Sequence, residues 1–93
     1  MSDVKPIPRE ELDRAVRISC RRLAAVIVKC MADTDTSFAL IAVRVDMTAE
    51  AVRAKLNTLM DGDCSNTSLG DAAVILWAMG ARLEFHVEPM PKA

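Results

Sequence analysis

The side chains of this chain that could do chemistry of their own are three cysteines, one histidine and two carboxylates in a turn. Cys20, Cys30 and Cys64 are odd in number, widely spaced and never arranged as CxxC. Such a pattern predicts neither a disulfide framework nor a zinc site. Cys20 and Cys30 stand in apolar helical sequence, and we interpret them as small buried hydrophobic residues.

The remaining candidates do not assemble a reactive centre. His86 has no metal-ligating partner at ligand spacing, so we expect it on a strand surface or in a dimer interface. Asp61 and Asp63 flank Gly62, which suggests a cation loop, but the ligand pattern of an EF-hand is missing. The sequence also lacks a glycine-rich phosphate loop, a nucleophile elbow and paired catalytic carboxylates. We therefore expect no catalytic residue, no metal and no cofactor, and we do not expect an enzyme.

Composition limits the class of protein further. The length of 93 residues, with 52% hydrophobic residues, predicts one folded domain over 1–93. Aromatic residues make up only 3%, so the core must be aliphatic, and a core this small often gains stability from a partner subunit. A net charge of −1 does not by itself indicate nucleic-acid binding, but the local potential of one face matters more than the sum. Neither a signal peptide nor a membrane-length apolar run is recognised, so we expect a cytoplasmic protein that does not enter a membrane.

The elements that would position any site begin with a long helix. A lead-in over 1–8 precedes a helix predicted over about 9–31. Its apolar residues recur at helical spacing: Leu12, Val16, Leu23 and Ile27. Three arginines share the opposite face: Arg14, Arg17 and Arg21. This arginine stripe is either a solvated, salt-bridged face or an edge that contacts phosphate or a partner.

Three shorter helices follow. Capping residues and apolar runs predict them over 37–45, over 48 to about 57 or 60, and from about 68 to 79. Asp46 and Met47 form a tight turn between the first two. Ser68 and Asp71 have the spacing of a capping box, and Gly80 is a stop signal.

A short strand is expected over 82–88, followed by a tail over 89–93. Leu83, Phe85 and Val87 alternate with charged or polar neighbours, which is typical of a half-buried strand. Because the sequence offers this strand no mate, we expect an antiparallel pair across a two-fold dimer axis. The alternative is an irregular tail that lies on the helices. Trp77, which is interpreted as core or interface, joins these three residues in the expected dimer interface.

The second and third helices have a mechanical use. In two short helices joined by a tight turn, the first braces the second, which can then enter the DNA major groove N-terminus first. The residues expected to pack inward are Ile41, Ala42, Val45, Met47, Val52 and Leu56. The residues expected to face outward on the third helix are Ala49, Glu50, Arg53 and Asn57.

The segment 37–57, with the 66–69 start and the 78–83 ending that follow it, resembles the lambda-repressor and Cro-like (XRE-type) helix-turn-helix family. The resemblance covers roughly 37–87. It implies an all-α bundle of four to five helices with one C-terminal β-strand, and binding of double-stranded DNA. Three positions depart from the family pattern: Phe38 replaces a glutamine, and Asp46 and Thr58 replace glycines.

The resemblance also implies roles for single residues. Ser37 and Thr48 would hydrogen-bond phosphate from helix starts. Arg53 would read guanine, and Glu50 would either accept from a cytosine amino group or only favour the helix N-terminus. Three further residues would contact phosphate or flanking groups, or else belong to a solvated face: Arg44, Lys55 and Asn57. Ala49 completes the expected DNA-facing set.

We therefore expect a sequence-specific transcriptional regulator, found with the nucleoid through its DNA. Its most economical form is a homodimeric repressor on an inverted-repeat operator, with half-sites about 34 Å apart. Two alternatives remain open: an antitoxin-type regulator that also binds a toxin protein, and a helix-turn-helix scaffold that binds another protein instead of DNA. The second is motivated by Phe38 and by the acidic pI of about 5.7.

Overall fold

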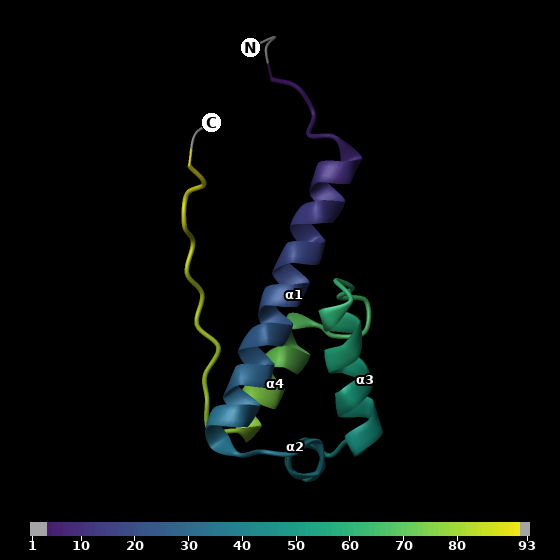
Figure 1. The fold of residues 1–93 in the computed structure, drawn as a ribbon, viewed down its shortest axis with the longest axis vertical. Helices are drawn as coiled ribbons and strands as arrows, with labels where there is room; N and C mark the ends of the chain where they lie inside the picture. The colour runs from purple at the N-terminus through teal and green to yellow at the C-terminus, as the bar shows by residue number, and fades with distance from the viewer. Residues whose placement is uncertain (1–3, 92–93) are drawn as a thin grey trace.

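The computed structural model describes residues 4–91, which form four α-helices (Figure 1). The helices are α1 (Arg9–Thr34), α2 (Phe38–Val45), α3 (Ala49–Met60) and α4 (Leu69–Ala78). The all-α class expected from the sequence is confirmed. Parts of the expected lead-in, residues 1–3, and of the expected tail, residues 92–93, lie outside the described residues.

The three short helices begin where hydroxyl side chains cap them. The hydroxyls of Ser37, Thr48 and Ser68 accept the backbone N–H groups of Leu40, Ala51 and Asp71 at 3.2, 3.0 and 3.0 Å. At α4 the Asp71 carboxylate also accepts the Ser68 N–H at 3.1 Å, which completes the predicted capping box. These helix starts are encoded locally, and the sequence predicts them within a residue.

The connection between α2 and α3 is a left-handed turn at Asp46. Its φ is 56° and its ψ is 49°, a conformation that aspartate tolerates better than most residues other than glycine. The N–H groups of Asp46 and Met47 both donate to the carbonyl of Ala42. The turn therefore ends α2 and starts α3 within three residues.

The core forms where the C-terminal half of α1 meets the other helices. Helices α2 and α3 pack on each other, α1 contacts α3 and α4, and α2 contacts α4. The core is aliphatic, as the low aromatic content predicted, and its members are Cys20, Ala24, Ile27, Ile41, Ala42, Val52, Leu56, Leu59, Ile75, Leu76, Ala78 and Met79. The six residues expected inward from 37–57 are all buried or half-buried.

The N-terminal half of α1 extends beyond the core. Every residue from 9 to 19 is exposed, including Leu12 at 43% and Val16 at 50%, so the first half of the apolar pattern of this helix does not reach the core. A helix of 26 residues is about 39 Å long, and the three short helices cannot cover it. Contact with the core begins at Cys20. Within residues 4–91, no helix combines the length and apolar character needed to cross a bilayer.

The strand expected over 82–88 is absent from the part of the chain that the structure describes. Residues 81–91 have no regular secondary structure, and 82–91 make no backbone–backbone hydrogen bond. The physical reason is that a single chain offers this segment no second strand. The segment instead runs back along α1 (Figure 1), where Met90 lines a shallow cavity together with Ile7, Leu12 and Ile18.

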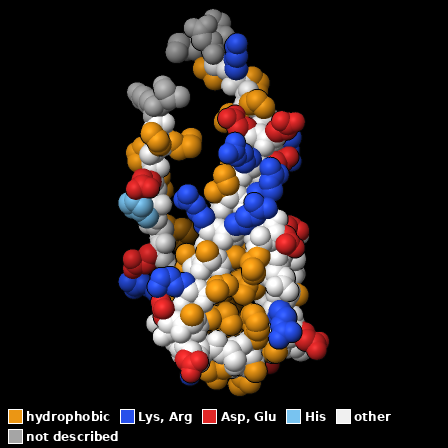
Figure 2. All heavy atoms as spheres, in the orientation of Figure 1, with side chains coloured by type: hydrophobic (Ala, Val, Ile, Leu, Met, Phe, Trp, Pro, Cys, Tyr) orange, Lys and Arg blue, Asp and Glu red, His pale blue; other side chains and the backbone are white. Residues whose placement is uncertain are grey.

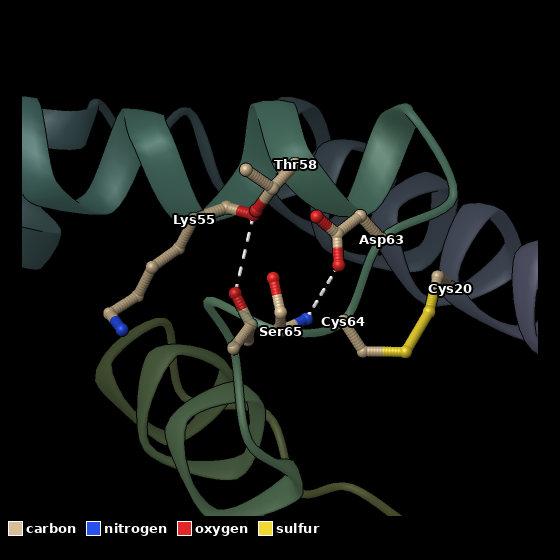
Figure 3. Close-up of a disulfide and its surroundings, with 7 residues drawn as sticks. Cys20, Lys55, Thr58, Asp63, Cys64 and Ser65 are labelled. Carbon is tan, nitrogen blue, oxygen red and sulfur yellow. Dashed lines mark hydrogen bonds between the residues drawn. A yellow bond between two sulfur atoms is a disulfide. The ribbon is translucent and has the colours of Figure 1, made fainter.

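Cys20 and Cys64 form a disulfide, which corrects the expectation that the cysteines are unpaired (Figure 3). The bond joins α1 to the 61–67 loop, across 44 residues of sequence and a Cα–Cα distance of 6.0 Å. The turn at Gly62 (φ 85°) presses this loop on α1, since a Cβ there would lie 2.9 Å from Cγ of Arg17. Cys30 is free and half-buried, as a small hydrophobic residue would be.

The disulfide predicts a thiol count. Air-oxidised protein, denatured and treated with Ellman's reagent, should titrate one thiol, and reduced protein should titrate three. Opening a loop of 44 residues should lower the free energy of unfolding by about 2–4 kcal/mol. The comparison is a urea titration of Cys64→Ser against Cys30→Ser, which keeps the bond. Three reactive thiols in oxidised protein would contradict the pairing.

Candidate functional site

Helix α3 presents one polar stripe to solvent. Glu50, Arg53, Ala54 and Asn57 are all exposed and follow each other at the spacing of a single helix face. The opposite side is anchored in the core by Val52, Leu56 and Leu59, which are 2%, 6% and 1% exposed. The α3 stripe, as we call these four residues, is therefore held in a fixed direction by the packing behind it.

Three of the residues expected to face outward lie in this stripe, and Ala49 does not. Ala49 is half-buried and packs against the core. Ala54 takes its place on the exposed side, and sequence reasoning missed it. Its position four residues after Glu50 is the signal that could have found it.

The hydroxyls of Ser37 and Thr48 lie at the starts of α2 and α3, and both residues are exposed. Each oxygen accepts a backbone N–H of its own helix. A hydroxyl also carries a proton to donate. Both residues can therefore cap a helix and bind an anionic oxygen at the same time.

Arg53 lies against an aromatic ring. Its guanidinium carbon is 5.3 Å from the centroid of the Phe38 ring, a cation–π distance. Phe38, the first residue of α2, is half-buried and packs against the core, so its ring is a fixed platform. The aromatic residue that departs from the expected glutamine thus orients the arginine of α3. Sequence spacing carries no signal for this contact, because the two residues lie on different helices.

Arg44 connects α2 to the end of α4. Its Nη1 donates to the carbonyl of Ala78 at 2.8 Å, where the last carbonyls of a helix need partners. Arg44 nevertheless stays exposed, and one hydrogen bond leaves several of the five donors of a guanidinium available.

Lys55 is turned away from the stripe. It follows Arg53 by two residues, which is about 200° around the helix. Its side chain is only 17% exposed, and Nζ donates to the carbonyl of Asn66 at 2.7 Å and to the carboxylate of Asp71 at 3.2 Å. The structure thus uses Lys55 to tie α3 to the loop and to the start of α4.

The 61–67 loop is held by its own polar contacts. Asp63 accepts the N–H of Ser65 at 2.8 Å (Figure 3), and this hydrogen bond lowers the pKa of the Asp63 carboxyl. Thr67 is buried, and its hydroxyl donates to the carbonyl of Lys55 at 3.3 Å. Over residues 4–91, no three acidic, histidine or cysteine side chains gather as metal ligands, at this turn or elsewhere.

Positive charge gathers on the exposed part of α1 (Figure 2). The three arginines of the predicted stripe, Arg14, Arg17 and Arg21, are all exposed. Through its contact with Gly62, Arg17 lies beside the end of α3. The overall charge of −1 therefore conceals a local basic surface.

The expected dimer residues are largely on the surface of this chain. Trp77 is 70% exposed on α4, so it is not a core residue, and Phe85 and Val87 are 73% and 90% exposed. Leu83 is half-buried and packs against the core.

The chain matches no protein-family model, and no curated protein or solved structure shows significant similarity to it.

The capping box of α4 predicts a pH dependence. The N–H of Ser68, and then Lys55, lower the pKa of Asp71 below its usual value of 3.8. A carboxyl with a depressed folded-state pKa stabilises the fold above its unfolded pKa, and this contribution is lost as the pH falls through the folded pKa. Asp71→Asn should therefore melt at a lower temperature than the wild type at pH 6, and the difference should shrink as the pH falls below 3.8. Asp61→Asn is the control, and a constant gap for Asp71→Asn would contradict this role.

Proposed function

We propose that this chain is a sequence-specific DNA-binding regulator in which α2 and α3 act as a helix-turn-helix. The observation that carries the proposal is the α3 stripe. It presents Glu50, Arg53 and Asn57 on the solvent side of a helix whose other side is locked in the core. Rigid presentation of base-reading side chains is what direct readout in the major groove needs.

The helix dimensions suit that groove. The major groove is about 12 Å wide and admits one α-helix. Helix α3 has 12 residues, and the short turn at Asp46 sets it against α2, which braces it from behind. The remaining helices supply the core that keeps α2 and α3 in place, as in the lambda-repressor-like bundle that the sequence resembles.

Roles follow for the exposed residues. Arg53 bonds guanine, and the Phe38 ring orders its guanidinium before DNA arrives, which lowers the entropy lost on binding. Ser37, at the start of α2, and Thr48, at the start of α3, donate hydrogen bonds to phosphates. Glu50 and Asn57 contact bases or flanking groups. Arg44 adds a phosphate contact, whereas Lys55 keeps its structural tie.

Two copies would bind an inverted repeat, with half-sites about 34 Å apart. The cytoplasm, where we propose that the protein lies with the nucleoid, keeps thiols reduced. There the contact of α1 with the 61–67 loop would depend on packing, and the Cys20–Cys64 bond would form on oxidation.

A second candidate is a protein-binding function, either added to DNA binding, as in an antitoxin, or in place of it. Exposed apolar side chains favour it: Val43 is 80% exposed on α2, and Val74 and Trp77 are 51% and 70% exposed on α4. This candidate predicts that a partner protein protects these side chains from solvent. If protein binding takes the place of DNA binding, the chain should also show no salt-dependent affinity for DNA.

The leading proposal is tested by fluorescence anisotropy with duplexes selected by the protein from a random-sequence pool. Wild type should bind the selected duplex better than a scrambled one, with an affinity that falls steeply with salt. Arg53→Ala should lose about 1–3 kcal/mol and most of the sequence preference. Lys29→Ala removes one exposed charge from α1 and should keep that preference. Failure to enrich any sequence, or an Arg53→Ala variant as selective as wild type, would contradict the proposal.

The platform role of Phe38 predicts a coupling. Phe38→Leu keeps an apolar residue but removes the ring face, so binding of the selected duplex should weaken by about 0.5–1 kcal/mol. In an Arg53→Ala background the same change should have no further effect. Thermal melting of all four proteins controls for damage to the core. Equal losses in both backgrounds would show that the ring does not act through Arg53.

A further inference from the structure

The segment 82–88 has two chemically distinct sides. Its charged residues share one side, because Arg82 pairs with Glu84 at 2.7 Å and His86 lies 3.9 Å from Glu88, each two residues apart. Leu83, Phe85 and Val87 occupy the alternate positions. The pattern is that of a strand, although the segment has no strand partner in this chain.

The segment is anchored at Leu83, whereas Met90, which is 88% exposed, only lies beside the N-terminal half of α1. Leu83 packs against the core, and Met90 lines a cavity of about 350 Å³ with Ile7, Leu12 and Ile18 of the N-terminal arm. Between these two points the backbone donors and acceptors of 84–88 make no backbone–backbone bond. An edge anchored at one end loses less entropy on pairing than a free tail does. This edge is therefore ready to accept another strand.

We propose that 82–88 pairs antiparallel with the same segment of a second copy, with Phe85 opposite Phe85 on the two-fold axis. In this register Arg82 faces Glu88 of the other copy, Glu84 faces His86, and Leu83 faces Val87. Symmetry makes each of these pairs twice. Opposite charges and apolar pairs directly across two strands stabilise a sheet.

Neighbouring registers are disfavoured by the same residues. Moving the axis to residue 84 sets Glu84 against Glu84, and moving it to residue 86 sets Glu84 against Glu88. An axis between two residues places apolar side chains opposite charged ones on both faces. Charge complementarity thus selects the second copy as occupant and Phe85 as the centre.

This inference deepens the dimer named in the proposed function, and it is tested without DNA. Phe85→Cys should crosslink to itself under oxidised glutathione, because directly opposite Cα atoms lie about 4.5–5.5 Å apart, within reach of a disulfide. Leu83→Cys should not self-crosslink, since its own copy lies four residues, about 13 Å, along the partner strand. An equimolar mixture of Leu83→Cys and Val87→Cys should give mixed dimers. All three experiments use a Cys30→Ser background and are read on non-reducing gels. Where crosslinking is expected, the amount of crosslinked dimer should be at least several-fold above that of the background protein alone.

A charge exchange gives an independent readout in analytical ultracentrifugation. Arg82→Glu sets like charges across the axis twice and should lower the dimer fraction at least several-fold. Adding Glu88→Arg should restore it, although this second change cannot repair the Arg82–Glu84 pair within one chain. A monomeric wild type, self-crosslinking of Leu83→Cys as efficient as that of Phe85→Cys, or no restoration by the double variant would overturn the register. If the cysteine variants crosslink as described but the wild type selects no DNA, the proposed function is overturned and the register stands.

Discussion

The crossing of α2 over α3 is the interaction on which the rest of the structure depends. Ile41 and Val52 meet the core there with 0% and 2% of their surface exposed, and Ala42 is small enough for two helices to approach closely. If this contact loosened, the left-handed turn at Asp46 would still end α2, but α3 would keep only its packing on α1 and the Lys55 tie to hold its direction. The exposed stripe is useful only because the buried side of the same helix cannot rotate.

The cationic residues around α3 have similar sequence contexts and different tasks. Lys55 donates hydrogen bonds to the 61–67 loop and to α4, and Arg44 donates to the carbonyl of Ala78. Both residues therefore stabilise the packing of the helices. Arg53 has no such backbone tie in the described chain and lies on the ring of Phe38 instead. Contacts between helices therefore distinguish the structural residues Lys55 and Arg44 from Arg53, and no local sequence pattern encodes such contacts.

Features that depend on neighbouring residues could be predicted from the sequence, whereas features that depend on contacts between distant segments could not. Caps at Ser37, Thr48 and Ser68 depend on residues three positions away, so the helices were predicted closely. The exposed arm of α1, the Cys20–Cys64 bond and the task of Lys55 depend on segments far apart in sequence. The strand over 82–88 fails in a single chain because its hydrogen bonds need another strand. Its alternating pattern is used only in the pairing with a second copy that we propose.

DNA reading by α3 is tested most directly by a chemical-shift map of the amides when a duplex selected from a random pool is added to ¹⁵N-labelled protein. If α3 reads the DNA, the largest changes should fall on 37–38 and 48–57, and the signal of the Arg53 side chain should be broadened or shifted. The amides of Val52 and Leu59 should keep their hydrogen-exchange protection. Changes concentrated on α4 around Trp77, with α3 unaffected, would contradict DNA reading by α3 and favour a protein-binding surface instead.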